Sequence, residues 1–588
     1  MIRSLSPLET AFFALCVLFI VIPTTYMLFE INRSLLVAVP AHSGTLTEGV
    51  IGSPRFINPL LAISDADRDL TLLLYSGLLR ATPEGTLIPD LAEKYQISDD
   101  GLIYTFTLRK DATFHDGTKV TADDIIFTIS KAQDAALKSP KRANWEGISV
   151  SKNSEQQVIF TLAQPYSPFL ENTTLGILPK HLWKDIDAEQ FPFSEYNTEP
   201  VGSGPFRVRK LKRDASGIQD SYILSPFKKF VLGTPYIQQL IIKFYPTEEE
   251  LVLAYQHGHV DSINSVSPES ASKFREQGEH LELSPLPRVF AVFFNQNQAQ
   301  VFAYEEVRKA LALAIDKDKI ITEVLSGYGI PIDGPIPPGL LSTDTSRKDL
   351  PAKEADVVEN ISDPSEKATT TPPLNPRIEE ARNVLLRNGW KFDEKLGMMI
   401  KKSSKGNASL SFSLATSNAP ELKAAAQIIK EAWEKLGAHV EVKIFETGDL
   451  NQNVIRPRKF DALLFGEVIG RDLDLYAFWH SSQMSDPGLN IALYANITSD
   501  KLLENARSIA NPDERAKKYR AFLDEVTIDR PAIFLYSPDF IYVVPSKVQG
   551  MTLGKITTPS ERFLGIHTWY LETEYVWEIF HEANSQRN

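Results

Sequence analysis

The sequence has one cysteine, Cys16, in 588 residues. A single thiol cannot form an internal disulfide or a cysteine-based zinc site, so both are excluded. The chain also lacks an excess of bases, because 62 lysines and arginines face 75 aspartates and glutamates, for a net charge of −13. Nucleic-acid binding needs a basic surface, so the composition excludes a nucleic-acid partner.

Recognisable catalytic motifs are absent as well. The sequence contains no phosphate-binding glycine loop, HExxH, GxSxG or kinase motif. Gly202–Pro205 (GSGP) is typical of a turn, and so is His115-Asp116-Gly117. His257 and His259 fall at the end of a predicted helix, where a C-cap is a better interpretation than a metal site. We therefore expect a binding protein with no catalytic residue, metal or cofactor.

One long uncharged run is present near the N-terminus. Thr10–Phe29 spans twenty residues without a charge, between Glu9 and Glu30. At 1.5 Å per residue it is about 30 Å long, the thickness of a bilayer core. We predict an uncleaved, single-pass membrane anchor, with the N-terminus inside and the bulk of the chain on the extracytoplasmic side of the cell membrane. Two alternatives stay open: a cleaved signal peptide, with VAVPAHS (37–43) as a weak cleavage site, and lipidation at Cys16.

Strand-like and helix-like patterns alternate along the rest of the chain. This alternation predicts an α/β protein, and the length predicts two or three domains. Predicted strands include 43–51, 104–109, 290–295 and 459–465, and predicted helices include 65–79, 305–320, 377–388 and 420–436. The segment 341–376 is rich in Ser, Thr, Asp and Pro, so we interpret it as an exposed loop or insertion.

The stretch Gly466–Gln483 (GEVIGRDLDLYAFWHSSQ) concentrates charges and rings after the predicted strand 459–465. It could be a polar loop, or an active site in which Glu467 and Asp472 form an acid–base pair. We favour a third interpretation, a binding site for a charged ligand, because a carboxylate at the end of a buried strand can pair with an ammonium group. The flat walls of this site are then expected from Tyr476, Trp479 and Tyr494.

Several segments resemble the extracellular solute-binding proteins of the oligopeptide, dipeptide and nickel class. They are FINPLLAISDADRDLTLLLYSGLLR, DLAEKYQISDDGLIYTFTLRKDATFHDGTKVTADDIIFTI, VGSGPFRV, VRKALALAIDKDKI, YGIPIDGPIPP, RDLDLYAFWHSSQ and NIALYANITSDKLLENA. Their order and spacing match the class from about Thr45 to about Val544, and the run from Asp90 to Ile129 is specific.

The resemblance implies a type II, periplasmic-binding-protein-like fold (a Venus flytrap) of the three-domain, peptide-binding subtype. Two lobes then close over an extended peptide and pass it to the permease and ATPase subunits of an ABC importer, with the binding protein acting as a monomer. The implied parts are an anchor (1–40), lobe I (44–80, 198–283 and 545–588), an accessory domain (81–197), and lobe II (284–544) with the insertion 341–376.

The resemblance also assigns site residues. A carboxylate just past the late strand holds the ligand's α-ammonium group. By position this is Glu467, with Asp472 and Asp474 as competitors. Further ligand-binding residues expected around this carboxylate or across the cleft are Arg471, Gly52, Ser53 and Asn295.

The resemblance leaves the ligand class open. The same fold also serves nickel chelates and sugars, and a ligand-sensing receptor without transport is a further alternative.

Overall fold

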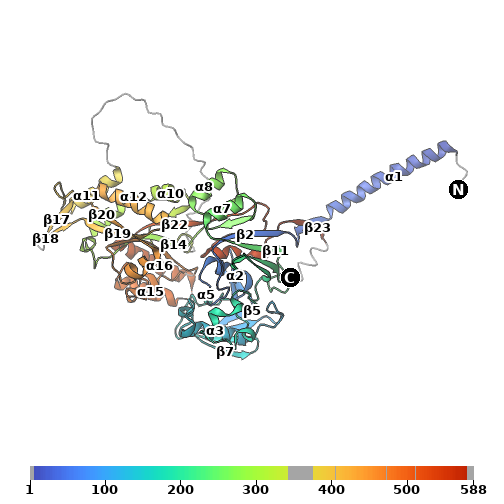
Figure 1. Ribbon diagram of the computed structural model, residues 1–588, viewed down its shortest axis with the longest axis horizontal. Helices are drawn as coiled ribbons and strands as arrows, with labels where there is room; N and C mark the ends of the chain where they lie inside the picture. The colour runs from blue at the N-terminus through green and yellow to red at the C-terminus, as the bar shows by residue number, and fades with distance from the viewer. Residues whose placement is uncertain (1–5, 342–374, 404–405, 472, 510, 579–588) are drawn as a thin grey trace, which may run out of the picture.

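The computed structural model describes residues 6–341, 375–403, 406–471, 473–509 and 511–578. Figure 1 shows an elongated body from which one helix, α1 (Pro7–Ser34), projects. A capping box between Ser6 and Glu9 starts this helix. Leu8–Ser34 is long and apolar enough to cross a membrane, and its most apolar window has no buried residue.

A mixed sheet of 12 strands runs through both lobes. Its order is β20-β19-β21-β14-β22-β12-β2-β11-β10-β9, and β13 and β15 also pair with β22. In lobe I, β2 is parallel to both β11 and β12, and in lobe II β19 is parallel to both β20 and β21. Helices alternate with these strands along the chain, which confirms the predicted α/β class.

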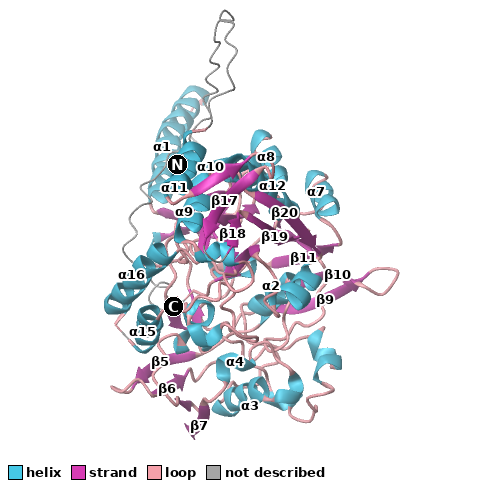
Figure 2. Cartoon of the chain, turned by 90° about the vertical axis from the view of Figure 1, so that its left-hand side faces the viewer, coloured by secondary structure: helices cyan, strands magenta, loops and turns pink. Residues whose placement is uncertain are grey.

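Lobe I and the accessory domain share one hydrophobic core. Its first residue in the sequence is Leu46 and its last is Trp569. By the predicted bounds, lobe I contains β2 (Thr45–Ile51), α2 (Asp65–Leu74), β3 (Leu79–Ala81), β9 (Phe206–Arg213), β10 (Gln219–Pro226), β11 (Gln239–Tyr245), α7 (Glu248–Gln256), β12 (Ser262–Asn264), α8 (Pro268–Glu276) and β13 (Leu281–Pro285). The accessory domain then contains β4 (Leu87–Pro89), β5 (Ala92–Ile97), β6 (Ile103–Leu108), α3 (Ala122–Gln133), α4 (Arg142–Trp145), β7 (Ser149–Ser154), β8 (Gln157–Thr161), α5 (Phe169–Asn172) and α6 (Lys180–Trp183). Figure 2 shows its strands β5, β6 and β7 at the end of the body opposite to α8 and α12.

Lobe II is built on strands that are buried on both faces. Along β14, Val292 and Phe294 enter one hydrophobic core, whereas Val289, Ala291 and Phe293 enter another on the opposite face. The lobe contains β14 (Arg288–Phe294), α9 (Glu305–Ala314), α10 (Lys317–Val324), β15 (Gly329–Pro331), α11 (Pro376–Arg387), β16 (Trp390–Asp393), β17 (Met398–Ser403), β18 (Gly406–Ser409), β19 (Ser411–Ser417), α12 (Pro420–Leu436), β20 (His439–Phe445), α13 (Thr447–Asp449), β21 (Ala462–Val468), α14 (Tyr476–Trp479), α15 (Ile497–Ser508), α16 (Pro512–Asp529) and β22 (Ala532–Val543).

Two neighbouring segments connect the lobes: the link from β13 to β14, and β22. The first part of β22 pairs with β14 of lobe II, whereas residues 539–543 pair with β13 of lobe I. Leu286 N–H donates to Pro538 O (3.0 Å), and the Ser537 hydroxyl donates to Leu286 O (2.6 Å), so the two connections are bonded to each other. The pairing partners of β22 therefore change from β14 to β13 along a single strand.

A buried charge cluster joins the C-terminal part of lobe I to its N-terminal part. The side chain of Arg562 is fully buried between Glu48 of β2 and Asp69 of α2. Its guanidinium donates to Glu48 Oε1 (3.0 Å) and to both oxygens of Asp69 (2.9 and 2.5 Å). Tyr542 also donates to Glu48 (2.9 Å), so that these buried charges are paired and hydrogen-bonded.

Three local predictions need correction. The predicted helix 65–79 is α2, which ends at Leu74, and Leu79 already belongs to β3. The predicted helix 305–320 is two helices, α9 and α10, because Asp316 accepts a hydrogen bond from the N–H of Lys319 and caps a new start. The predicted strand 459–465 is β21, which begins at Ala462 and continues through Glu467 to Val468. The prediction for 341–376 falls almost wholly outside the described residues.

Candidate ligand-binding site

Glu467 lies near the C-terminal end of β21, opposite Val289 of β14. Its side chain is 5% exposed, and neither carboxyl oxygen has a hydrogen-bond partner among the described residues. Burial raises the pKa of this carboxyl well above its ordinary value. Glu467 therefore keeps its proton at pH values where a surface glutamate is ionised, unless a cation pairs with it.

Arg288, the first residue of β14, pairs with Val468 and so points to the opposite face of the sheet from Glu467. Its Nε is buried without a hydrogen-bond partner among the described residues. Burial lowers the pKa of Arg288, and the charges of Asp65 and Arg68 on α2 of lobe I act on it in opposite directions. Sequence reasoning missed Arg288, because an arginine at the start of a strand has no distinguishing local pattern.

Asp474 is already neutralised within lobe II. Arg507 of α15 donates to its Oδ2 (3.1 Å), and the N–H of Tyr476 donates to its Oδ1 (3.2 Å). The same guanidinium lies over the rings of Tyr476 (4.5 Å) and of Tyr166 in the accessory domain (5.1 Å). Glu467, rather than Asp474, is thus the acid that still lacks a cationic partner in this segment, as far as the described residues go.

Arg471 connects lobe II to lobe I. Its guanidinium forms ion pairs with Glu561 of lobe I and with Glu171 of α5 (3.7 Å), and it donates to Lys555 O (3.1 Å). The Arg471 side chain is only 7% exposed. The structure thus describes lobes in contact through this arginine. Its neighbour Asp472 lies outside the described residues.

Two of the predicted aromatic walls lie in the core of lobe II. Trp479 is 0% exposed and packs against Phe534 and Tyr494, with ring centroids 5.7 and 6.2 Å apart. Tyr494 is 6% exposed and donates its hydroxyl proton to Asp529 (2.7 Å). Tyr476 is half-buried and stacks on His480 at 4.1 Å. Of the three rings, Tyr476 is the most exposed, and it shares the Arg507 guanidinium with Tyr166 of the accessory domain.

The residues expected across the cleft are Asn295, Gly52 and Ser53. Asn295 follows the far end of β14, six residues from Val289, or roughly 20 Å along the strand. Its side chain closes the loop after the strand by donating to Arg458 O (2.9 Å). Gly52 and Ser53 directly follow β2 in lobe I, where the Ser53 hydroxyl donates to Gln219 Oε1 of β10 (3.4 Å). Their assignment as ligand-binding residues stays a prediction.

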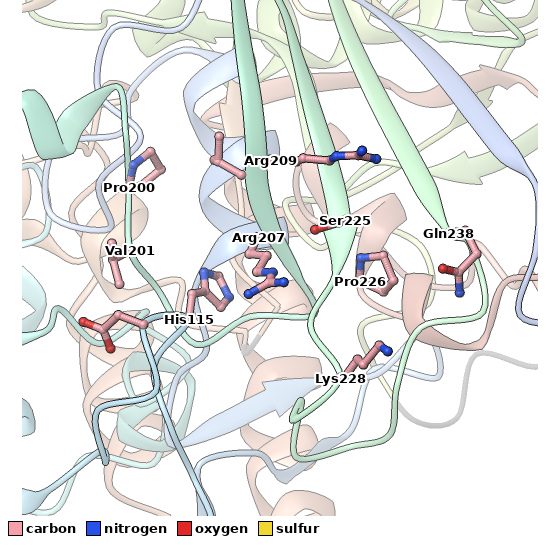
Figure 3. Close-up of a pocket in the computed structure, with 11 residues that line it drawn as sticks. His115, Pro200, Val201, Arg207, Arg209, Ser225, Pro226, Lys228 and Gln238 are labelled. Carbon is pink, nitrogen blue, oxygen red and sulfur yellow. The ribbon is translucent and has the colours of Figure 1, made fainter.

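A cavity of about 540 Å³ lies elsewhere, between lobe I and the accessory domain (Figure 3). His115 points into it beside Arg207, and none of its lining residues belongs to lobe II. Both ring nitrogens of His115 already have backbone partners, Gly204 O (3.1 Å) and Gly202 N–H (3.3 Å), and burial lowers its pKa to about 4. His115 therefore stabilises a turn, as expected from the sequence. The cavity that it lines is separate from the contact between lobes I and II.

The sequence model for bacterial extracellular solute-binding proteins, family 5 (middle), matches residues 86–487. The chain belongs to this family. Its solute-binding relatives include the oligopeptide-binding protein AppA of Bacillus subtilis, 28% identical over 540 residues that cover 90% of this chain and 92% of AppA. The dipeptide-binding protein of Escherichia coli is 24% identical over 543 residues, which cover 88% and 94% of the two chains.

Solved structures of this solute-binding family have the same fold. The structure of AppA from Bacillus subtilis in complex with a nonapeptide superposes with a TM-score of 0.66 at 26% identity. The superposition covers 91% of this chain and 100% of the AppA chain. The predicted membership of the family and its two-lobed α/β fold are therefore confirmed.

Proposed function

We propose that this solute-binding protein captures peptides between lobes I and II and delivers them to the permease and ATPase of an ABC importer, without covalent chemistry. Membership of the family supports binding of a solute, and the peptide-binding relatives support the ligand class. The observation that carries the assignment of the site is the buried carboxyl of Glu467, which lacks a partner among the described residues.

In this proposal Glu467 pairs with the α-ammonium group of the peptide. An ammonium ion near a buried carboxyl favours its ionised form, because the attraction is strong where water is excluded. Binding then releases the proton that Glu467 carries in the unliganded protein. Arg288 begins β14 beside the end of β21, so its side chain and that of Glu467 lie at the same end of the sheet, on opposite faces. We assign Arg288 to anionic groups of the ligand.

The first test is the identity of whatever solute co-purifies with the protein. The full chain is purified in mild detergent, denatured, and the released molecules are identified by mass spectrometry. Short peptides of varied sequence are expected, because main-chain hydrogen bonds bind a peptide without reading its side chains. A single non-peptide solute that also binds with high affinity in calorimetry would overturn the peptide assignment and leave the family unchanged.

We further propose that α1 is a retained anchor and that the lobes lie on the extracytoplasmic side as a monomer. The helix is long enough to span a bilayer. Strand β1 (Leu36–Pro40) follows it at once and pairs with β23 (Thr573–Trp577), so cleavage after Pro40 would remove a strand of the folded protein. The intact mass and the oligomeric mass of protein extracted from membranes test the retention of α1 and the monomeric state.

A further inference from the structure

The two ends of the described chain form a small ribbon at the base of α1. Strands β1 and β23 pair in antiparallel register, with Leu36 opposite Trp577 and Ala38 opposite Tyr575. They form a two-stranded sheet of their own, which Figure 1 shows where the projecting helix leaves the body. Directly opposite residues share a face, so Trp577 and Tyr575 lie on one side of the ribbon together with Leu36 and Ala38.

This ribbon exposes large aromatic side chains. Tyr575 is 70% exposed and Trp577 45%, and Leu35 beside them is 46% exposed. The other six of the seven tryptophans are each less than 2% exposed. A two-stranded ribbon is marginally stable in water by itself, and exposed tryptophan and tyrosine are typical of the interface between membrane and water. The ribbon therefore has the composition of a membrane-facing element.

The depth of Trp577 follows from one hydrogen bond. Its indole Nε1–H donates to Asn32 Oδ1 (2.9 Å) in the last turn of α1. The uncharged run ends at Phe29, so Asn32 lies three residues, or about 4.5 Å, beyond the hydrocarbon core if the helix is perpendicular to the bilayer. The headgroup layer on each side is about 5–8 Å thick. The bond thus places the Trp577 indole within the headgroup layer.

The charges around the ribbon indicate which lipids it suits. Glu572, Glu574 and Glu578 belong to or flank β23, whereas Arg33 is the base in the last turn of α1. Anionic headgroups would be repelled by this acidic segment. The ribbon is instead attracted to the bilayer through its aromatic and apolar side chains, so a bilayer of zwitterionic lipid is sufficient for this contact.

We infer that the ribbon β1–β23 rests in the headgroup layer of the bilayer, with Trp577 and Tyr575 as interfacial anchors. The C-terminal strand is then a second membrane contact, which holds the lobes at a fixed height above the anchor. The backbone ladder supports a rigid connection, because it extends past both strand ends through Ala41 N–H to Glu572 O (2.9 Å) and Glu578 N–H to Leu35 O (3.0 Å). The inference rests on the anchoring of α1 proposed above.

The test is depth-dependent quenching of tryptophan emission. The full chain is placed in phosphatidylcholine nanodiscs in which some lipids carry a nitroxide, either near the headgroup or near the acyl end. The six buried tryptophans form a constant background. We expect the shallow label to remove the emission of one tryptophan out of seven, the deep label to remove less, and Trp577→Phe to abolish the difference.

The possible failures of this experiment are distinct. If the chain does not elute with the nanodiscs, or its intact mass lacks α1, the anchoring fails and the inference fails with it. If the chain is inserted but Trp577 is quenched by aqueous iodide and not by the shallow lipid label, the ribbon is in water and only the inference is overturned. Peptide binding, measured on the same sample, is independent of both results.

Discussion

Two buried glutamates, one in each lobe, have opposite surroundings. Glu48 in lobe I is 0% exposed and receives hydrogen bonds from Arg562, Tyr542 and Asn264. Glu467 in lobe II is 5% exposed, and the described residues offer it no partner. A buried charge is costly unless it is paired. The fold supplies the partners of Glu48, which marks it as structural, whereas we assign the partner of Glu467 to the ligand.

The largest effect is expected in lobe I. Arg562→Met should lower the free energy of unfolding by about 3–5 kcal/mol, because it leaves Glu48 and Asp69 buried without their cation. Urea unfolding of the variant and the parent measures the loss. Arg456→Met is the matched control, since the Arg456 side chain is 61% exposed. A loss below about 1 kcal/mol for Arg562→Met would show that the cluster is not structural.

Glu467→Gln should have the next largest effect, and it acts on the ligand. We expect peptide affinity to fall by about 2–4 kcal/mol in titration calorimetry, because an amide cannot form the buried ion pair. Glu93→Gln, at an exposed position of β5, is the control and should bind as the parent does. Unchanged affinity of Glu467→Gln would remove Glu467 from the site.

The same variant should stabilise the unliganded protein near neutral pH. The pKa of Glu467 is raised in the folded state, so its contribution to stability is present at low pH and is lost as pH rises above the ordinary glutamate value. Glutamine has no such loss, so the melting temperature of Glu467→Gln at pH 7 should exceed that of the parent. The difference should disappear near pH 4, and a lower melting temperature at pH 7 would contradict the unpaired state of Glu467.

Peptide affinity should increase with pH below the raised pKa of Glu467. Because binding favours the ionised carboxyl, each complex releases up to one proton, which corresponds to a change of up to about tenfold per pH unit. Calorimetry in buffers of different ionisation enthalpy measures the released proton. The Glu467→Gln variant should show no such release, and proton uptake by the parent would refute the pairing.

The smallest effect concerns Arg471, whose partners come from lobe I and the accessory domain. Arg471→Gln should weaken peptide binding by about 1 kcal/mol, because its pairs with the partly exposed carboxylates of Glu561 and Glu171 exist only when lobe II contacts them. Combining it with Glu561→Gln in a double-mutant cycle should give less than the sum of the two single effects. Additive losses would mean that the contact does not contribute to closure.

Local signals in the sequence predicted much of the fold. The helix predicted at 420–436 is α12, because Pro420 suits its first turn and Gly437 ends it in a left-handed conformation (φ +104°). Helix α3 likewise begins after Thr121, which forms a capping box with Asp124 three residues on. Such caps depend on residues a few positions apart, which is why a single sequence reveals them. The overlooked cap at Asp316 shows that a continuous helical pattern can hide one.

The site was harder to predict, because it depends on distant pairs. Arg471 and Glu561 are 90 residues apart in the chain, and no local pattern indicates that they meet. Trp479 and Tyr476 are neighbours in one polar segment, yet one ring is buried in the core and the other faces Arg507. Whether a ring at this position packs inward is decided by α15, α16 and the sheet, so a pattern of residue types could not separate the two.

The buried cluster around Arg562 also has a consequence for how the protein is made. Glu48 is paired with Arg562, which lies 514 positions later in the chain, and Asp69 is paired with the same arginine. A polypeptide that emerges amino end first cannot complete lobe I until almost all of it has been synthesised and exported. Until then its earliest strands remain available to chaperones and proteases. A prematurely terminated product that lacks Arg562 would keep two uncompensated acids, Glu48 and Asp69, in its interior.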